Sequence, residues 1–569
     1  MSSGPAVVLA ETEINGRALA SKAKVPSDAI QTKEGTFYVS KPYRSSYNKK
    51  LKAAIAFVPR RSHFDIENEQ SGANEFRGFF TLFWISLFLF TVRSYVRSIE
   101  TNGYPLNFEF ASMFSRDART LALSDAVLVL STGLCVPFAK AVQKGWIKYY
   151  YYGVVIQHLF QTLVLFTAVK WTFNRHWPWV QSGFLTLHTL TLIMKMHSYN
   201  TVNGYLKWAS EESGRLLTQL RTATERVGGW DAALAAAKQN LEERDAAAGT
   251  TSSSPGVGTP DMPDGSQKSY VDAPVAAALR NRLVRVSEDV AAEAQEEKPK
   301  PVGPFPHPLV DHPDAEISAL AADYTDAESD LVGMGPEYVR WPANLTYKNF
   351  AVYMLIPSLV YELEYPRTNK IRPLYVFEKT VATGGTFALL YTVTETFILP
   401  LTPGPDQSFF RSLLDLALPF MLAYLLLFYI IFECICNGFA ELSYFADRGF
   451  YEDWWNSTSW EEFSRKWNKP VHTFLLRHVY ASSISSYHLS RSGAMFFTFL
   501  ISALAHELVM AVVTQKIRMY LFTLQLIQIP LIAVGRIPAI KRNKLMGNMV
   551  FWLGLYAGFP LLCVAYVAY

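Results

Sequence analysis

Residues 499–513 read "FLISALAHELVMAVV" and place His506 beside Glu507 inside an apolar run. With its flanks the run is long enough to cross a bilayer, which takes about 20 apolar residues. Ionisable side chains at that depth are costly, so they face a protein interior or a wet cavity and usually serve a function. The stretch therefore predicts a membrane-spanning helix with a chemical role.

The composition of the 569-residue chain favours a membrane protein with polar interruptions. Half of the residues are hydrophobic and 18% are charged. The formal net charge of +4 is small for this length, so we expect no nucleic-acid partner, which would require a clustered basic face. The four cysteines lack the spacing of a zinc site, and we expect no metal.

Nine apolar stretches approach the length of a membrane crossing when read with a window of about 19 residues. They are residues 78–96, 121–142, 149–169, 177–196, 376–401, 413–437, 494–513, 516–534 and 548–569. A tenth run, 347–361, is shorter and suits a re-entrant or interfacial segment. The sequence therefore predicts an all-α polytopic membrane protein.

These stretches fall into two transmembrane regions, 76–206 and 343–569. A polar low-complexity insert at 207–342 separates them, and its Ser, Gly and Pro residues bury too little apolar surface to offset the entropy of ordering. The part of the insert nearest the first region has a helical composition and continues from the preceding span. Residues 1–75 show no cleavable signal peptide and are predicted to be a largely disordered cytosolic tail. Four intervening spans would put the insert in the cytosol as well.

Between residues 441 and 487 the chain is neither a clean span nor a polar loop. Ser459 and Glu462 form a capping-box pattern before a short helix. Asn468 and His472 are four residues apart, so on a helix they share a face. Alternatively, Asn468 only caps a helix whose first turn contains Pro470. The spacing alone leaves both interpretations open.

His506 also has two interpretations. An imidazole inside a span can be a hydrogen-bonding partner between helices, or a neutral general base that takes a hydroxyl proton. Ser502 lies one turn earlier on the same face, whereas Glu507 points elsewhere and is expected to be paired structurally. Lys195 and Glu433 leave open a polytopic transporter with a polar path, although no inverted repeat supports it.

Three motifs appear in order near the C-terminal end. They are "FYEDWWN" at 450–456, "WNKPVH" at 467–472 and "SALAHE" at 502–507. They resemble the signature, the asparagine region and the intramembrane histidine of the sterol and diacylglycerol acyltransferases in the membrane-bound O-acyltransferase (MBOAT) family. "LLRHVYASSISSYHLS", "LVYELEYPRT" and "MKMHSYN" look like the fungal sterol O-acyltransferases, also called acyl-CoA:sterol acyltransferases.

The resemblance implies an endoplasmic reticulum enzyme with about nine transmembrane helices around an intramembrane reaction chamber, in a homodimer or a dimer of dimers. It implies that His506 is the catalytic base for the sterol 3-hydroxyl and that Asn468 orients the thioester or stabilises its oxyanion. Acyl-CoA is then a co-substrate, and no cofactor is implied. The residues implied to bind acyl-CoA are Phe450, Tyr451, Asp453, Trp454, Trp455, Asn456, Arg465, His472, Tyr480 and Ser502.

A site of this kind has two substrates with opposite preferences. Acyl-CoA arrives from water, whereas ergosterol or cholesterol and the ester product prefer the lipid bilayer. The depth of His506 would keep water away from the thioester. A diacylglycerol O-acyltransferase of the same family is the alternative, because it shares the motifs and esterifies a glycerol hydroxyl instead.

Overall fold

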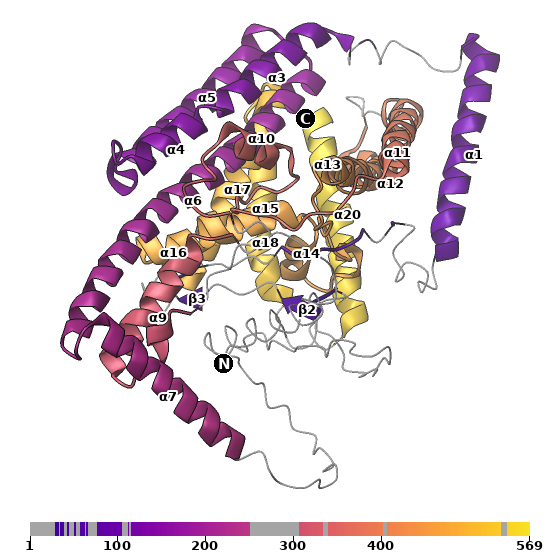
Figure 1. The fold of residues 1–569 in the computed structure, drawn as a ribbon. Coiled ribbons are helices and arrows are strands. Elements are labelled where there is room, and N and C mark those ends of the chain that lie inside the picture. Colours follow the sequence, from indigo (N-terminus) through magenta and orange to yellow (C-terminus); the bar gives the residue numbers. More distant parts are fainter. Residues whose placement is uncertain are drawn as a thin grey trace, which may run out of the picture.

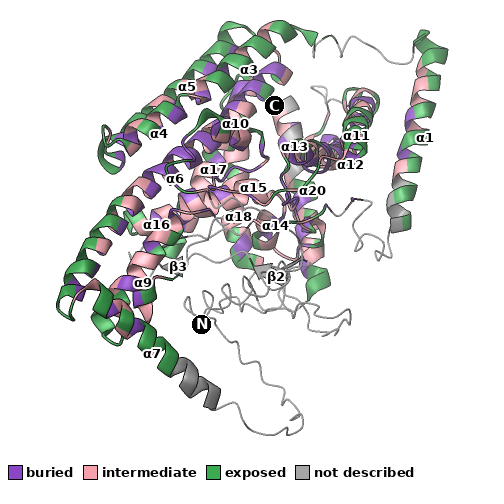
Figure 2. Ribbon diagram, viewed as in Figure 1, coloured by how far each residue is buried: buried purple, intermediate pink, exposed green. Residues whose placement is uncertain are grey.

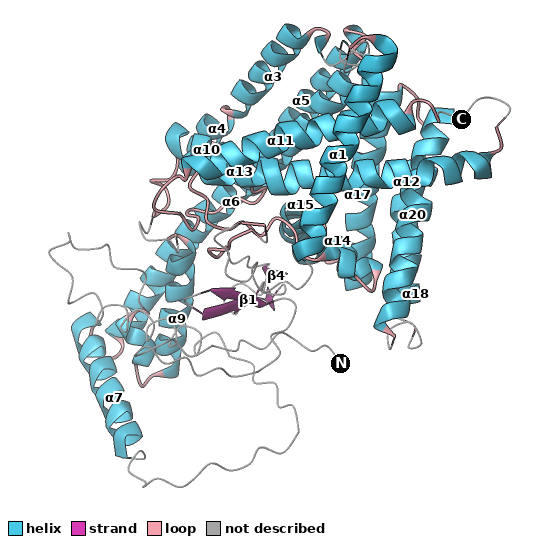
Figure 3. Ribbon diagram, turned by 90° about the vertical axis from the view of Figure 1, so that its right-hand side faces the viewer, coloured by secondary structure: helices cyan, strands magenta, loops and turns pink. Residues whose placement is uncertain are grey.

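The computed structural model shows a mainly helical chain (Figure 1). It describes residues 57–62, 64–65, 77–104, 112, 115–250, 306–333, 339–401, 407–535, 537 and 543–568, together with four short strands before them. The strands form two antiparallel hairpins: β1 (Ala29–Thr32) pairs with β2 (Gly35–Tyr38), and β3 (Tyr43–Arg44) pairs with β4 (Leu51–Lys52). Figure 3 shows that helices dominate the remaining regular structure.

Every predicted span of the first region lies in a helix. The helices are α1 (Arg77–Asn102), α3 (Ala118–Thr132), α4 (Cys135–Gln143), η2 (Tyr149–Gly153), α5 (Val154–Asn174) and α6 (Trp179–Glu225). Chain reversal after α4 uses Gly145, whose φ of 78° suits glycine best. Large apolar side chains cover the outer faces of these helices, for example Leu130 and Leu159, which are 77% and 66% exposed. Figure 2 shows α5 as predominantly exposed, as expected for a surface in contact with lipid.

The helices of the second region also follow the predicted spans. They are α10 (Tyr347–Leu355), α11 (Pro373–Val393), η4 (Thr394–Ile398), α12 (Phe409–Phe428), η5 (Tyr429–Ile435), α13 (Cys436–Leu442), η6 (Trp454–Asn456), α14 (Trp460–Lys466), α15 (Lys469–Phe474), η7 (Leu475–Ala481), α16 (Ser482–Tyr487), α17 (Arg491–Thr514), α18 (Tyr520–Gly535) and α20 (Lys544–Ala568). The π-helical segments η5 and η7 join their neighbours into longer helices, and π-turns of this kind occur often at functional sites.

Within the described residues, four helices are long and apolar enough to cross a membrane: Ala118–Gln143, Tyr149–Asn174, Phe409–Leu442 and Arg491–Thr514. A fifth apolar helix, Tyr520–Gly535, is shorter. The polytopic helical class is therefore confirmed, and the number of crossings stays a prediction. The run at 347–361 forms the short helix α10 followed by a loop.

The insert is folded at both of its ends. Helix α6 has 47 residues, so at about 1.5 Å per residue it extends well beyond the membrane. Its distal part packs with α7 (Trp230–Thr250), η3 (Pro308–Asp311) and α9 (Ala315–Asp330) around a buried apolar cluster that includes Leu220, Leu309 and Ile317. The helical continuation expected at the first end of the insert is confirmed, whereas the packed helix α9 at the other end was not expected, because its few apolar residues find partners only in α6 and α7. The Ser- and Pro-rich middle lies outside the described residues.

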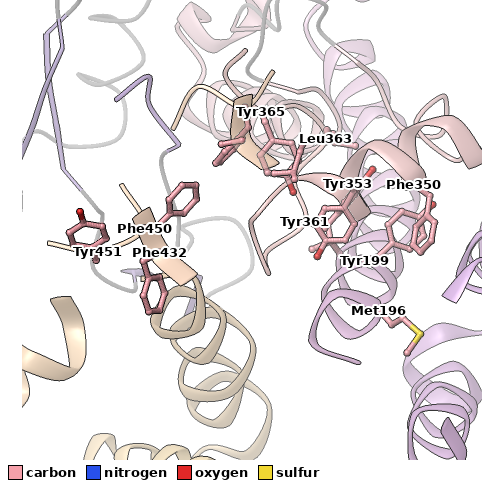
Figure 4. Packing of buried hydrophobic residues seen from close by; sticks show 14 of the residues in the cluster. Met196, Tyr199, Phe350, Tyr353, Tyr361, Leu363, Tyr365, Phe432, Phe450 and Tyr451 are labelled. Atoms are coloured by element: carbon pink, nitrogen blue, oxygen red, sulfur yellow. The ribbon is translucent and has the colours of Figure 1, made fainter. Parts of the chain in front are cut away.

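The largest apolar core joins the two membrane regions. Tyr199 of α6 packs edge-on against Tyr361, with ring centroids 4.8 Å apart, and Tyr353 and Tyr365 stack nearby (Figure 4). The same core reaches Phe450 and continues through aromatic residues of α12 and α14. The "LVYELEYPRT" and "MKMHSYN" segments therefore contact each other, although they lie far apart in the sequence.

The N-terminal tail is packed at its last described residues. Val58, Ser62 and Asp65 are each no more than 6% exposed. Their partners come from the N-cap residue of α11, from η5 and from the loop after α13, all more than 300 residues away. The prediction of a largely disordered tail is therefore wrong for this part of the chain, because its backbone and polar side chains find hydrogen-bond and ion-pair partners in distant segments.

Candidate active site

His506 lies in the middle of α17 with an exposed side chain. Its Nδ1 is 2.7 Å from the carbonyl oxygen of Ser502, one turn earlier. Because a carbonyl oxygen only accepts hydrogen bonds, Nδ1 must hold the proton in the neutral imidazole. The other nitrogen, Nε2, then has a free lone pair that can accept a proton, as a general base requires.

Glu507 points into a different part of the protein, as predicted. It is buried, and its carboxylate accepts hydrogen bonds from the backbone nitrogens of Met519 at 2.7 Å and Phe522 at 3.1 Å. The hydroxyl of Tyr566 donates to it at 3.0 Å. Glu507 thus caps the N-terminal end of α18, where a negative charge is favoured by the helix dipole. Its role is structural.

Asn468 is the N-cap of α15. Its Oδ1 accepts a hydrogen bond from the backbone nitrogen of Val471 at 3.1 Å, and Pro470 occupies the first turn. In the described part of the chain its side-chain nitrogen makes no hydrogen bond. Capping uses the oxygen and leaves the amide donor available, so the two interpretations of Asn468 are compatible.

Five of the predicted site residues lie on two helical stretches that contact each other. Asn468, His472 and Tyr480 follow one another along the continuous helix formed by α15, η7 and α16, and η7 packs against α17, which carries Ser502 and His506. Figure 1 shows α15, α17 and α18 together near the centre of the molecule. His472, Tyr480 and Ser502 are half-buried. No hydrogen bond between described residues links Asn468 to His506.

Residues 450–456, here called the signature segment, are partly structural. Phe450, Tyr451 and Trp454 are at most 4% exposed, so their side chains pack in the interior and support the residues at the surface of the site. Trp454 packs against several rings, including Trp467 at 4.9 Å and Trp552 of α20 at 5.9 Å between centroids. The segment therefore fastens α20 to the aromatic core.

The remaining signature residues lie nearer the surface. Asp453 and Asn456 are exposed, and Trp455 is half-buried. The backbone oxygen of Trp455 accepts hydrogen bonds from Asn548 at 3.0 Å and Trp552 at 3.1 Å. Asp453 and Asn456 are thus the two side chains of the signature segment that are most accessible to a ligand.

The predicted N-cap at the start of α14 is confirmed, and the return bond of the capping box is shifted by one residue, to Thr458. Ser459 accepts from the backbone nitrogen of Glu462 at 3.2 Å, and Glu462 accepts from the backbone nitrogen of Thr458 at 2.9 Å. Burial raises the pKa of Glu462, but its bonds with Lys466 and Thr458 outweigh burial and leave that pKa below its usual value. Lys466 also pairs with Asp453 at 2.9 Å, which ties α14 to the signature segment.

Arg465 lies on the same short helix, one turn before the cap residue of α15, and its side chain is half-buried. Its contact with acyl-CoA, which the family resemblance implies, stays a prediction.

The other intramembrane polar residues have separate partners. Lys195 donates to the carbonyl oxygens of Tyr353 at 2.8 Å and Ile356 at 2.7 Å, so it caps the C-terminal end of α10. Glu433 pairs with Lys379 at 2.8 Å. Neither contacts His506, so the polar path that a transporter would need is not continuous among the described residues.

Sequence reasoning missed which residues pair with these groups. The Nε2 of His478, for example, is buried 2.7 Å from the hydroxyl of Ser198 on α6. Sequence reasoning also did not identify Lys379, whose position inside an expected span was the available signal. Both contacts connect elements that are distant in the sequence.

The geometry can be compared with known proteins. Residues 131–568 match the MBOAT, membrane-bound O-acyltransferase family, and this range contains every predicted site residue. The chain belongs to the membrane-bound O-acyltransferase family.

Individual relatives extend this comparison. The chain is 33% identical to a probable sterol O-acyltransferase 1 of Schizosaccharomyces pombe, over 90% of this chain and 86% of the relative. It is 31% identical to a sterol O-acyltransferase 2 of Candida albicans, over 88% and 77%. A diacylglycerol O-acyltransferase 1-2 of Oryza sativa subsp. japonica is 32% identical, but over 42% of this chain and 51% of the relative.

Proposed function

We propose that this membrane-bound O-acyltransferase transfers a long-chain acyl group from acyl-CoA to the 3-hydroxyl of a sterol. The observation that supports a sterol most directly is coverage. The similarity to proteins named sterol O-acyltransferases extends over about nine-tenths of the chain, whereas the diacylglycerol enzyme matches 42% of it. We propose ergosterol or cholesterol as the acceptor, and a diacylglycerol acceptor is the outcome that would redirect the assignment.

The proposed reaction uses His506 as the general base. The lone pair on Nε2 takes the proton of the sterol hydroxyl while the hydroxyl oxygen attacks the thioester carbonyl carbon. The carbon–sulfur bond then breaks, and the proton passes from the imidazolium to the leaving thiolate. The products are steryl ester and free CoA, without a covalent acyl-enzyme.

Asn468 is proposed to assist through its amide nitrogen. Negative charge develops on the thioester oxygen in the transition state, and a fixed donor stabilises that charge more than it stabilises the substrate. The cap bond from Oδ1 to Val471 fixes the plane of this amide. A preoriented donor needs no rearrangement during the reaction.

The surroundings proposed for the reaction follow from its substrates. CoA is charged and enters from water, whereas sterol and ester partition into lipid. We propose that the enzyme lies in the endoplasmic reticulum membrane as a homodimer or dimer of dimers, with acyl-CoA reaching His506 past Asp453, Asn456 and Arg465. Sites in a water-poor interior also protect the thioester from hydrolysis.

The test is esterification of labelled oleoyl-CoA by membranes from an acyltransferase-deficient host. Ergosterol, cholesterol and diacylglycerol are offered in parallel to wild type, His506→Ala and His506→Gln at matched expression. We expect steryl ester from wild type alone, because glutamine keeps a polar side chain but cannot accept the proton. Triacylglycerol as the sole product would assign the diacylglycerol reaction, and an active His506→Gln would exclude the general-base role.

A further inference from the structure

Residues 57–65, "FVPRRSHFD", form a segment that we call the strap. All of them except His63 are described, and three of the side chains are buried. The strap precedes residues 131–568, the range that matches the family. It nevertheless packs against the parts of the chain that surround the signature segment.

The first contact of the strap is with the loop that leads into the signature segment. The backbone nitrogen of Arg60 donates to the carbonyl oxygen of Ala446 at 2.9 Å, and the nitrogen of Arg448 donates to the carbonyl oxygen of Arg60 at 3.3 Å. The Arg60 guanidinium pairs with Asp447 at 2.9 Å, and both side chains are largely buried. The backbone and the side chain of Arg60 thus both bond to the same loop, residues 446–448.

The second contact reaches the carboxylate of Glu433. The hydroxyl of Ser62 donates to Glu433 Oε2 at 2.6 Å, and the hydroxyl of Tyr451 donates to the same oxygen at 3.0 Å. One carboxylate oxygen therefore links the strap to the second residue of the signature segment. Asp65 continues the contact by pairing with Arg372 at 2.8 Å.

The signature segment is connected in turn to the cap of α15. The backbone nitrogen of Lys469 donates to the carbonyl oxygen of Phe450 at 3.0 Å, and the Lys469 ammonium pairs with Glu452. Lys469 directly follows Asn468 in the chain. Gly449 lies so close to Arg60 that a Cβ at this glycine would be 2.5 Å from Nη1. A shift of the strap would therefore displace backbone that is bonded to the start of α15.

We propose that the strap is a positioning element of the acyl-transfer site. Arg60 and Ser62 act through Asp447, Glu433 and Tyr451 to hold the signature segment against the start of α15, which sets the position of Asn468. Neither strap residue is a catalytic residue. The inference rests on the proposed acyl transfer, because the effect of substitutions in the strap is measured as the rate of that reaction.

The experiment is a double-mutant cycle in the full-length purified enzyme. Arg60→Gln, Asp447→Asn and the double variant are compared with wild type, and Arg119→Gln serves as the control because it makes the same change at an exposed arginine on α3. The initial rate is measured against acyl-CoA concentration at saturating sterol and divided by the amount of folded enzyme. A role confined to stability would lower that amount and leave the kinetics of the folded enzyme unchanged.

We expect each single substitution to lower kcat/KM for acyl-CoA by about tenfold, and the double variant to be no worse than the poorer single, since both break one contact. Arg60→Lys should retain part of the activity. The control should match wild type. Losses that multiply in the double variant, or an Arg60→Gln enzyme equal to the control, would overturn the proposal.

A second variant covers the case in which Arg60→Gln does not fold. Ser62→Ala removes one hydroxyl that bonds to Glu433 and leaves the Arg60 contacts in place. A severalfold loss of kcat/KM per folded molecule supports the positioning role of the strap, and unchanged kinetics overturn that role. If wild type forms no ester from any acceptor, the proposed function itself fails, whereas an active wild type with insensitive variants refutes the strap alone.

Discussion

The buried ion pair between Lys379 and Glu433 yields the sharpest stability prediction. Both side chains are at most 2% exposed, and the charged atoms are 2.8 Å apart. At an effective dielectric constant of about 20, their attraction is about 6 kcal/mol, which is partly offset by the loss of hydration of each ion. Removal of one partner from such a pair typically costs about 3–5 kcal/mol.

The two single variants should differ. Lys379→Met leaves Glu433 with neutral hydrogen-bond donors only, among them Ser62, whereas Glu433→Gln leaves Lys379 with Glu378 at 3.5 Å. We therefore expect Lys379→Met to lower the free energy of unfolding by about 3–5 kcal/mol and Glu433→Gln by less. The double variant contains no unpaired buried charge and should be more stable than Lys379→Met alone.

Reversible unfolding in mixed micelles of increasing denaturing detergent fraction, followed by tryptophan fluorescence, measures these differences. Leu418→Ala is the control, because this leucine is 68% exposed on α12 and its removal does not uncover a charge. The reasoning fails if the double variant loses as much stability as the sum of the two singles. It also fails if Lys379→Met is no less stable than Leu418→Ala.

Three further predictions concern the site. Asn468→Asp keeps a capping oxygen but removes the amide donor, so kcat should fall about 100- to 1,000-fold at an unchanged melting temperature, and a normal rate would contradict the proposed donor. Glu507→Gln weakens the cap of α18, so a melting temperature equal to that of wild type would contradict the capping role. The pKa of Glu462 is lowered in the folded state, so its stabilising effect is full above about pH 4.5 and is lost as pH falls through the folded pKa. The difference in melting temperature between wild type and Glu462→Gln should therefore shrink on acidification, and a constant difference would refute this assignment.

Sequence reasoning succeeded where the relevant contacts are local. The N-cap bond of α14 joins Ser459 to a residue three positions later, and the His506 contact with Ser502 is one helical turn long. Such spacings follow directly from helix geometry. The pairing expected for Glu507 was also found, although its partners on α18 could not be named in advance.

Prediction failed where the contacts join distant parts of the chain. Ser62 and Glu433 are 371 positions apart, and no periodicity in either segment indicates the other. The strap was interpreted as disordered because its polarity is high and its buried partners are absent from the local sequence. The same limit applies to α9, whose few apolar residues form a core only after α6 and α7 supply the rest. Tertiary contacts thus account for both errors: polar pairing in the strap and apolar packing at α9.

The arrangement of α17 explains why an acid and a base are adjacent in its apolar run. Successive residues on an α-helix are separated by about 100°, so His506 and Glu507 cannot face the same surroundings. Glu507 is fixed by the first turn of α18 and by Tyr566, which restricts rotation of α17 about its axis. The exposed face that carries His506 is thereby fixed as well. One of the two ionisable residues orients the helix, and the other is exposed for the proposed proton transfer.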